Sequence, residues 1–378
     1  MKYKVEDALE KILDYRGKTP KKSNNGIPVI SAKCIKNGRI DYSSCYFISS
    51  GEYGKFMTRG FPRKGDIILT TEAPLGNVAK LNREDIGVAQ RVLTLRGKAG
   101  VLDNDYLLYF LKSGEGQNLL KSRESGTTVT GIKQSEFRKL EIDLPPISIQ
   151  KRMVKILLLL DQKIDINTRI NKNLLDLARR LFDQEYQKAR KVVPFTDLIQ
   201  INGGGTPKTG VKDYWGGSIP FFTPKDVGDP ITLETEKYIT EPGLAKCNSR
   251  LYPKGTTFVT ARGTVGKLGL AGVPMAVNQS CYALTSEIIP SSLIYFFAEK
   301  TVKSLRKKAN GAVFNAIVMR DFNPERVKEI KPTVLSKLSE VIRPLIDIMI
   351  INEEENIQLA NIRDSLLPKL LSGEIKLS

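Results

Sequence analysis

Few of the residue types that carry covalent or metal chemistry occur in this chain where they could act together. The sequence of 378 residues contains no histidine, and its four cysteines, Cys34, Cys45, Cys247 and Cys281, form no CxxC pair. Ser-His-Asp triads and Cys-His dyads therefore lack their base, and zinc fingers and zinc ribbons lack their ligands. We expect the thiols to be core residues of a protein in a reducing compartment, and we expect no metal site.

Three segments resemble enzyme motifs only superficially. An adenine methyltransferase needs a (D/N)PP(Y/F) motif, but in Asp143-Leu144-Pro145-Pro146-Ile147 a leucine separates the acid from the prolines, and an apolar stretch follows. Such a segment is typical of the start of a helix. The glycine-rich segments 203–205 and 263–269 match neither GxGxxG nor a P-loop, so turns are favoured. The acidic residues form no nuclease-like cluster, and we expect no catalytic residue in this chain.

The charge of the chain indicates a polyanionic partner. It has 59 Lys and Arg against 41 Asp and Glu, a formal net charge of +18, and a pI near 9.6. Such a surface favours nucleic acid over a membrane. Apolar runs such as Ile156 to Leu160 are too short to span a bilayer, and the N-terminus lacks a signal-peptide core, so we expect a cytoplasmic protein.

The candidate DNA contacts are cationic and amide side chains in loops that also contain glycine and threonine, because such groups bind phosphates and base edges. They are Lys18, Lys33, Arg59, Arg63, Thr71, Glu72, Gln90, Arg91, Thr127 and Thr128 in the first half, and Lys208, Lys225, Arg262, Thr264, Asn278, Gln279, Asn310 and Asn315 in the second half. A single surface Lys or Arg is more often a solvated charge than a base contact. For Gln90 and Gln279 the alternative is a buried structural hydrogen bond. We expect Trp215, Phe221 and Phe222 in the core rather than stacked on bases.

Short strands must hold these loops, and their pattern occurs twice. Runs at 29–30, 46–48, 66–70 and 91–95 predict strands, and 105–113 predicts a helix. Gly17-Lys18-Thr19-Pro20 is repeated by 204–207, the segment 64–70 by 254–260, and Gln90 by Gln279, at intervals of about 185 to 192 residues. We therefore predict one internal duplication. Within this duplication, Thr71-Glu72 aligns near Ala261-Arg262. A side chain that accepts hydrogen bonds in the first copy is thus replaced by one that donates them in the second.

Each copy is followed by a heptad pattern that predicts a long helix. Apolar residues three or four apart predict two coiled-coil stripes, at Ile149, Met153, Ile156, Leu160, Ile170, Leu174, Leu177 and Leu181, and at Leu335, Leu338, Ile342, Leu345, Met349, Leu359, Ile362, Leu366 and Leu370. The first helix, of forty residues, would be roughly 60 Å long. Asn167 and Asn352 interrupt the stripes and could fix the register of an antiparallel pair, or could lie at solvated edges.

These patterns predict an α+β protein with two tandem α/β domains, separated by two antiparallel coiled-coil helices and related by a pseudo-two-fold repeat; the resemblance described next implies that the two domains are target-recognition domains. The predicted boundaries are 1–146 for the first domain, 147–187 for the central helix, 188–332 for the second domain, and 333–378 for the C-terminal helix.

The whole chain resembles the specificity subunit of Type I restriction-modification enzymes. The resemblance lies in the GKTP and GGTP segments, in KGDIILTTEAPLGNVA and KGTTFVTARGTVGKLG, in LPPISIQKRMVKIL, and most specifically in the terminal NIRDSLLPKLLSGEI. It implies a subunit without catalytic activity, whose two domains each recognise half of a split DNA target while the helices act as spacer and docking site. It also implies two adenine-N6 methyltransferase subunits as partners, with restriction and motor subunits in the full complex. S-adenosylmethionine, ATP and Mg²⁺ are then expected on those partners and no cofactor on this chain.

Two other classes of function remain open from the residues alone. A free-standing DNA methyltransferase would bind S-adenosylmethionine as an isolated chain. A coiled-coil scaffold with incidental basic charge would bind DNA without sequence preference and with strong weakening by salt.

Overall fold

The chain forms two units, each containing one larger sheet and a part of both long helices. The computed structural model describes residues 1–375 except 37, 127–129, 229 and 309–315. Unit 1 comprises Met1–Gln162 and Leu359–Ser378, and unit 2 comprises Lys163–Gln358. These limits differ from the predicted domain boundaries, because each long helix contributes one part to unit 1 and the other part to unit 2.

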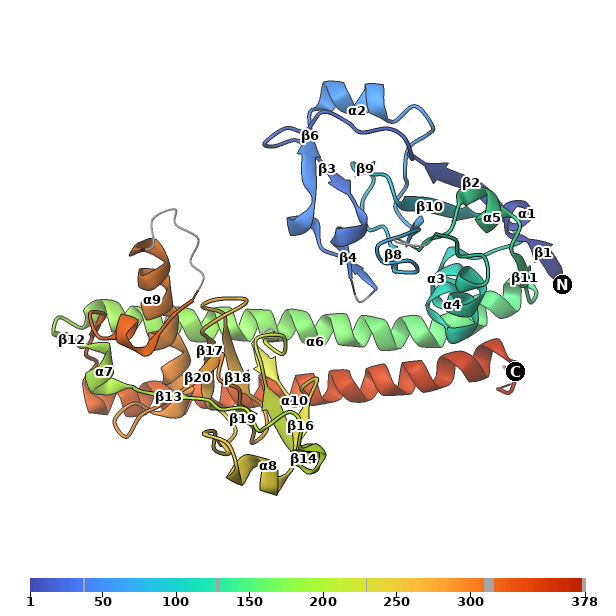
Figure 1. The fold of residues 1–378 in the computed structure, drawn as a ribbon. Coiled ribbons are helices and arrows are strands. Elements are labelled where there is room, and N and C mark those ends of the chain that lie inside the picture. Colours follow the sequence, from blue (N-terminus) through green and yellow to red (C-terminus); the bar gives the residue numbers. More distant parts are fainter. Residues whose placement is uncertain (37, 127–129, 229, 309–315, 376–378) are drawn as a thin grey trace. The chain divides into compact units, whose positions relative to one another are not determined.

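The main sheet of unit 1 is antiparallel and has the strand order β2-β10-β7-β8. Its strands are β2 (Leu9–Asp14), β7 (Ile67–Thr70), β8 (Val78–Lys80) and β10 (Val92–Gly97). Every residue of β7 is buried, as its short apolar run predicts. The helices α3 (Asn104–Lys112) and α4 (Gly114–Lys121) share one apolar core with this sheet (Figure 1).

Smaller sheets complete unit 1. The strand β3 (Ile27–Ile30) pairs antiparallel with β6 (Tyr46–Ile48) and parallel with β9 (Gly87–Val88). The other elements are β1 (Lys2–Lys4) paired with β11 (Glu141–Asp143), β4 (Ile35–Lys36) paired with β5 (Arg39–Ile40), and the helices α1 (Val5–Ala8), α2 (Ser50–Phe56) and α5 (Gln134–Arg138).

Unit 2 repeats this arrangement. Its main sheet has the order β13-β20-β17-β18-β15, and a second sheet has the order β16-β14-β19. The strands are β12 (Val192–Pro194), β13 (Gln200–Gly203), β14 (Trp215–Phe222), β15 (Ile231–Thr232), β16 (Tyr238–Ile239), β17 (Thr257–Thr260), β18 (Leu268–Ala271), β19 (Ala276–Val277), β20 (Cys281–Thr285) and β21 (Arg326–Lys328). The helices outside the long pair are α7 (Phe195–Leu198), α8 (Glu241–Ala245) and α9 (Ser291–Lys308).

The shared topology confirms the predicted duplication. Both β3 and its equivalent β14 pair with one antiparallel and one parallel neighbour, and β1–β11 is matched by β12–β21. The predicted strands and the helix at 105–113 are present within one or two residues. Phe221 and Phe222 are buried as expected, and so are Cys34, Cys45 and Cys281, whereas Trp215 and Cys247 are only half-buried.

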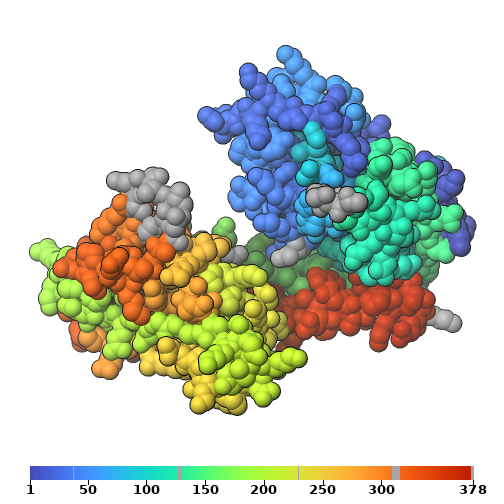
Figure 2. Space-filling view, viewed as in Figure 1, coloured from blue at the N-terminus to red at the C-terminus, as the bar shows by residue number. Residues whose placement is uncertain are grey.

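Two long helices follow the two copies, α6 (Ile147–Lys188) and α10 (Pro332–Leu371). Within unit 2, Asn167 of α6 contacts Glu355 of α10 and Asn171 contacts Met349, so the chain directions are opposite. The parts of α6 and α10 within unit 1 share an apolar core with α3 and α4. In the space-filling view, the C-terminal part of α10 (red) lies beside the residues of α3 and α4 (turquoise) (Figure 2). The predicted antiparallel pairing is therefore present within unit 2.

The predicted seam of the helices needs correction. Ile156, Ile170, Leu177 and Ile362 are exposed, while Val154, Leu157, Ala178 and Phe182 of α6, and Ile346, Ile350 and Leu367 of α10, are buried. Both helices carry apolar residues on more than one face, and packing against α3, α4 and α9 selects a face beside the predicted stripe.

The start of α6 confirms the interpretation of the two prolines. The backbone N–H groups of Ile149 and Gln150 donate to the Pro146 carbonyl at 2.8 and 3.0 Å. The buried Gln150 side chain donates to the carbonyls of Val101 and Pro145 and accepts from the Asp103 N–H. This segment is therefore a helix start tied to α3, and not a methyltransferase motif.

Candidate nucleic-acid interface

One edge of the main sheet of unit 1 gathers three loops. The strands β2 and β7 end at this edge and β10 begins there, because Leu93 pairs with Asp14 and Val92 with Thr70. The loops are 15–20 after β2, 71–77 after β7, and 89–91 before β10. We call this region the loop edge of unit 1. Antiparallel pairing brings these distant segments together.

Cationic side chains concentrate at the loop edge. The Arg16 guanidinium donates to the Thr71 hydroxyl at 3.3 Å, and the Lys18 ammonium donates to the Thr58 hydroxyl at 2.5 Å. Arg59 donates to the carbonyls of Asp14 and Arg16. These bonds occupy only some of the donors on each cation, so the remaining N–H groups can bind phosphate or base edges. The sequence prediction missed Arg16, although it directly precedes the Gly17-Lys18-Thr19-Pro20 segment.

A glutamine and a threonine connect two of the loops in both units. The Gln90 amide donates to the Thr19 hydroxyl at 2.8 Å and to the Lys18 carbonyl at 3.1 Å. At the equivalent place in unit 2, the Thr206 hydroxyl donates to the Gln279 amide oxygen. We call each contact a glutamine–threonine bridge. The bridge gives each glutamine a structural contact with a loop that carries cationic residues. It is not the buried hydrogen bond of the alternative, because Gln90 is half-buried and Gln279 is exposed.

The loop edge of unit 2 is the place where β13 and β17 end and β20 begins, and it is built more tightly. A Cβ atom at Gly204 would lie 2.1 Å from the Asn278 carbonyl oxygen, and one at Gly205 would lie 2.5 Å from the Asn248 nitrogen. Only glycine fits at both positions. Arg262 and Thr264 are exposed in the loop after β17, and the Thr264 hydroxyl donates to the Pro224 carbonyl at 3.2 Å. Burial raises the pKa of the neighbouring Tyr282, and the charge of Arg262 partly opposes that rise.

The other predicted contacts of unit 2 are distributed unevenly. Lys208 and Lys225 are exposed, and Lys225 pairs with Glu236 at 3.2 Å. The half-buried Asn278 accepts from the Ser280 N–H at 3.0 Å, which supports a turn role. Asn310 and Asn315 of this unit, and Thr127 and Thr128 of unit 1, lie outside the described residues.

Thr71 requires a correction as a direct DNA contact. Its side chain is only 1% exposed and its hydroxyl accepts from Arg16, so it supports the loop from inside. Its neighbour Glu72 is partly exposed and pairs with Arg91 at 2.5 Å. Lys33 is exposed and lies in the 3-10 helix Ala32–Cys34, which follows β3 of the second sheet.

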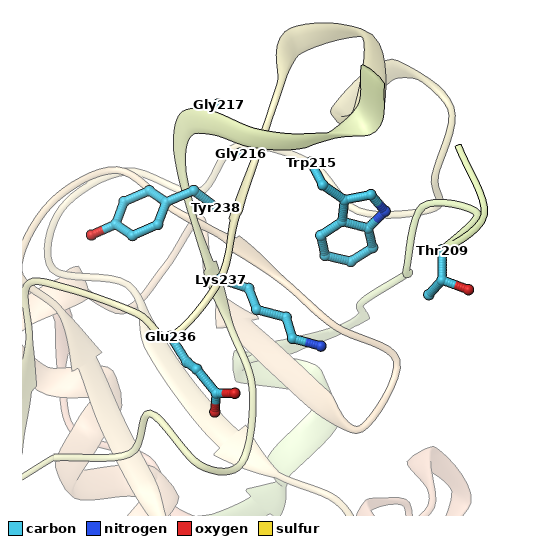
Figure 3. A pocket seen from close by; sticks show the side chains of 7 residues that line it. All are labelled: Thr209, Trp215, Gly216, Gly217, Glu236, Lys237 and Tyr238. Carbon is cyan, nitrogen blue, oxygen red and sulfur yellow. The ribbon is translucent and has the colours of Figure 1, made fainter. Parts of the chain in front are cut away.

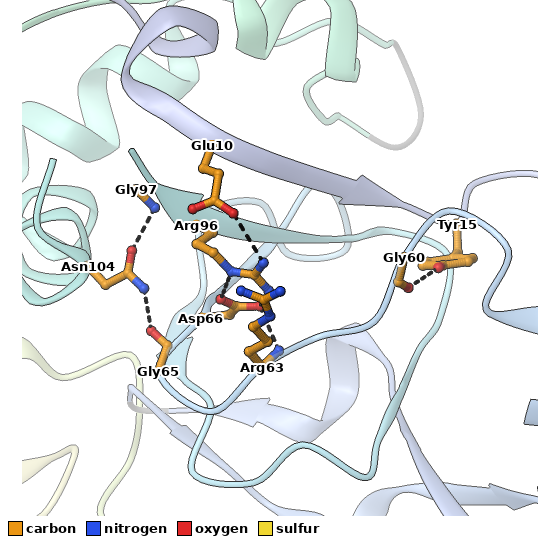
Figure 4. A network of polar contacts seen from close by, with 9 residues as sticks. All are labelled: Glu10, Tyr15, Gly60, Arg63, Gly65, Asp66, Arg96, Gly97 and Asn104. Atoms are coloured by element: carbon orange, nitrogen blue, oxygen red, sulfur yellow. Dashed lines mark hydrogen bonds and ion pairs between the residues drawn. The ribbon is translucent and has the colours of Figure 1, made fainter. Parts of the chain in front are cut away.

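Arg63 does not join the loop edge. It precedes β7, whereas Thr71 and Glu72 follow this strand, so Arg63 lies at the opposite end. Its N–H donates to the Asp66 carboxylate at 2.8 Å (Figure 4). It lines a cavity of about 600 Å³ together with Glu84 and Asp85. The lining contains three carboxylates, of Glu10, Glu84 and Asp85, and three cations, of Lys11, Arg63 and Arg96. Its charges therefore balance, and it is not the cationic surface that a phosphate backbone prefers.

A shallow pocket of about 500 Å³ lies in unit 2 beside Trp215 (Figure 3). The Lys237 ammonium lies 5.7 Å from the centre of the Trp215 ring, and the indole N–H donates to the Lys208 carbonyl at 3.3 Å. Trp215 also packs edge-on against Phe221, 5.5 Å between ring centres. The indole therefore has structural partners on several sides, as expected for a residue at the border of the core.

Among the described residues, no cluster of Cys, Asp or Glu could hold a metal ion. Within the same residues, no helix is long and apolar enough to cross a bilayer.

Comparison with known proteins identifies relatives along most of the chain. The family model of the Type I restriction modification DNA specificity domain matches residues 2–176 and 188–328. The MjaIX specificity subunit of a Type I restriction enzyme from Methanocaldococcus jannaschii is 25% identical, over 93% of this chain and 87% of that protein. The HindI specificity subunit of a Type I restriction enzyme from Haemophilus influenzae is 20% identical, over 83% of this chain and 87% of that protein. A crystal structure of the S subunit of a Type I restriction-modification system from M. genitalium has the same fold, with a TM-score of 0.57, 16% identity, and coverage of 98% of this chain and 95% of that one.

Proposed function

Because this chain belongs to the family of Type I restriction modification DNA specificity domains, we propose that it is the sequence-recognition subunit of such a system, with each unit recognising one half of a bipartite DNA target. The observation that carries the proposal is the loop edge, which occurs once in each unit on equivalent strands. Both edges present cations beside amide and hydroxyl groups, the combination that binds phosphates and base edges. The divergence of the two edges supports two different half-sites.

We further propose that the chain has no catalytic activity and acts through partner subunits. Adenine methylation would then belong to methyltransferase subunits that bind S-adenosylmethionine, and ATP with Mg²⁺ to restriction subunits where these are present. Extraction of the target adenine from the duplex would also belong to the methyltransferase. A cytoplasmic location follows from this role.

Exposed aliphatic residues on the long helices support two copies of one partner. Among the described residues, five aliphatic side chains of α6 and four of α10 are between 39% and 59% exposed. Six of them form three pairs whose members are 185 residues apart, the same interval as the starts of the helices. The pairs are Ile156 with Val341, Ile166 with Ile351, and Leu177 with Ile362. We call these six residues the outer stripe. Repetition of exposed aliphatic side chains is unusual for a solvated surface and favours protein contacts.

Charge substitutions in the outer stripe test this docking. Ile166→Glu and Ile351→Glu should each weaken binding of the methyltransferase subunit at least about 10-fold, because burying such a side chain contributes about 1.5–3 kcal/mol. Thr168→Glu, at an exposed polar position of the same helix, is the matched control. Calorimetric titration of the purified subunits gives the affinities. Equal affinity for all three variants would exclude the outer stripe as the docking surface.

Methylation mapping tests the recognition function itself. Cells that carry this chain with its methyltransferase should show one bipartite methylated motif. If the assembled complex instead binds random duplexes equally and loses affinity steeply with salt, the chain is a non-specific scaffold. Binding of S-adenosylmethionine by the pure chain would favour an independent methyltransferase.

The spacer role of the helices has a separate test. An insertion of four residues into both α6 and α10 lengthens each helix by about 6 Å. The methylated motif should then keep its two half-sites but change the number of unspecified base pairs between them. An unchanged gap would contradict the spacer role.

A further inference from the structure

Residues 72 and 262 occupy the same place in the two units. Each is the second residue after the central strand, β7 or β17, and each forms a single β-bridge with a later loop, to Gly131 and to Ala316. Equivalent backbone hydrogen bonds hold the residue before each of them. In unit 1, the Thr71 N–H donates to the Arg91 carbonyl (2.9 Å) and the Thr71 carbonyl accepts from the Ile132 N–H (2.9 Å). In unit 2, the Ala261 N–H donates to the Ser280 carbonyl (2.7 Å) and the Ala261 carbonyl accepts from the Ile317 N–H (2.8 Å). Two side chains are thus attached to one common framework.

The two side chains have opposite charges. Glu72, 26% exposed, accepts from Arg91 at 2.5 Å. In unit 2 the equivalent of Arg91 is Ser280, and Arg262 is exposed. In the described part of the chain, no carboxylate pairs with Arg262. Unit 1 therefore presents a carboxylate fixed by an arginine, and unit 2 presents an arginine whose planar donor pair is available.

We propose that residues 72 and 262 are matched base-contacting positions of the two loop edges. Arg262 selects guanine through paired donors to O6 and N7, and Glu72 selects a base with an exocyclic amino group, cytosine or adenine, in the major groove. The inference rests on the proposed DNA-recognition function and adds the residues and base types that distinguish the half-sites.

The charge reversal argues for base edges over phosphates. A phosphate contact requires a donor or a cation, and the Glu72 carboxylate is neither. If the common framework places position 262 against the sugar–phosphate backbone, the equivalent position in unit 1 would bring two anions together. A base edge offers donors as well as acceptors, so it accommodates both Glu72 and Arg262.

Substitution of Arg262 separates base contact from phosphate contact. The complex with methyltransferase subunits is titrated with duplexes in which one base pair of the target is changed at a time. Arg262→Ala should reduce discrimination at a single guanine by about 5- to 100-fold and leave the other positions unchanged. Arg262→Lys, which keeps the charge but not the paired donors, should lose most of the same discrimination. Lys254→Ala, an exposed cation before β17, is the control.

If Arg262→Ala instead weakened binding equally on every duplex, and reduced the salt dependence of the affinity by the amount expected for about one lost phosphate contact, the assignment of Arg262 would be overturned. For unit 1, Glu72→Gln keeps an acceptor for Arg91 but can also donate, so the preference at one position of the other half-site should shift toward adenine. An unchanged preference there would overturn the assignment of Glu72. A wild-type complex without preference at any position would refute the proposed function itself, which is a different result.

Discussion

The ion pair between Asp66 and Arg96 in unit 1 allows a quantitative test of how the two copies differ. The Arg96 guanidinium donates to both carboxylate oxygens of Asp66, at 2.8 and 2.7 Å (Figure 4). Asp66 is 2% exposed and the Arg96 side chain is 12% exposed, while Glu10 approaches Arg96 at 3.7 Å. These contacts with the carboxylates also raise the pKa of Arg96. The second copy has no such pair, because Thr256 and Thr285 occupy the equivalent positions.

Replacing Asp66 and Arg96 by threonine, the residue found at both positions of the second copy, gives a double-mutant cycle. Arg96→Thr removes both guanidinium bonds to the buried Asp66 carboxylate, which then keeps the bond from the Arg63 N–H. This variant should lower the free energy of unfolding of unit 1 by about 3–5 kcal/mol. Asp66→Thr leaves an arginine that keeps Glu10, and should cost about 1–3 kcal/mol. The double variant should lie within about 2 kcal/mol of wild type, because neither charge remains. The new hydroxyl of Asp66→Thr could donate to the Arg63 carbonyl, as Thr256 donates to that of Pro253 at 2.7 Å.

Hydrogen exchange followed by mass spectrometry on the full chain measures this cycle. Amides of β7 and β10 report on unit 1, and amides of β17 and β20 in unit 2 serve as an internal control. Thermal unfolding should agree, with the Arg96→Thr transition of unit 1 lower by about 6–20 °C for a unit of this size. If Arg96→Thr alone leaves exchange in β7 unchanged, or if the double variant is as unstable as the sum of the single variants, the argument from the buried charge is wrong.

Three further predictions concern polar side chains that are buried or half-buried. The buried Thr94 hydroxyl has no hydrogen-bond partner among the described residues, so Thr94→Val should raise the unfolding free energy by about 1 kcal/mol in a urea titration. A lower unfolding free energy would contradict this prediction. Gln90→Leu removes the glutamine–threonine bridge to Thr19 and should accelerate amide exchange of the loop 15–20 about fivefold or more, and unchanged exchange would show that the bridge does not hold the loop. The Asn352 amide donates to the Asn171 amide oxygen at 2.8 Å, so Asn352→Leu should lower the free energy of unfolding by about 1–3 kcal/mol. The double variant Asn171→Leu with Asn352→Leu should recover stability but let the helices pair in more than one register. Cysteine cross-linking would then give multiple products.

The register role of Asn167 and Asn352 stays a prediction, although the structure defines their contacts. Asn167 is buried and its amide donates to Glu355 at 2.7 Å, whereas Asn352 donates to Asn171, so the two asparagines do not contact each other. The Lys163 and Asn167 contacts lower the pKa of Glu355. Pairing of each asparagine with another polar residue could not be predicted, because the sequence contains no information on which residues lie opposite.

Local patterns predicted much of the architecture. The strands at 66–70 and 91–95, the start of α6 after Pro146, and the duplication follow from short-range preferences and from repeated segments, which are present in the order of residues. The same comparison aligned Glu72 with Arg262 correctly, because the two copies share one topology. The basic composition and the missing histidine likewise restricted the chemistry before any fold was known.

Long-range packing determined the remaining features. Apolar residues occupy several faces of α6 and α10, so spacing alone could not distinguish Leu157, which is buried, from Ile156, which is exposed. The sheets and α9 make that choice, because only one face of each helix can pack against them. For the same reason Arg16 was missed and Arg63 was included among the DNA contacts. Their positions at the loop edge and at the opposite end of β7 depend on strand pairing between residues that are distant in the chain.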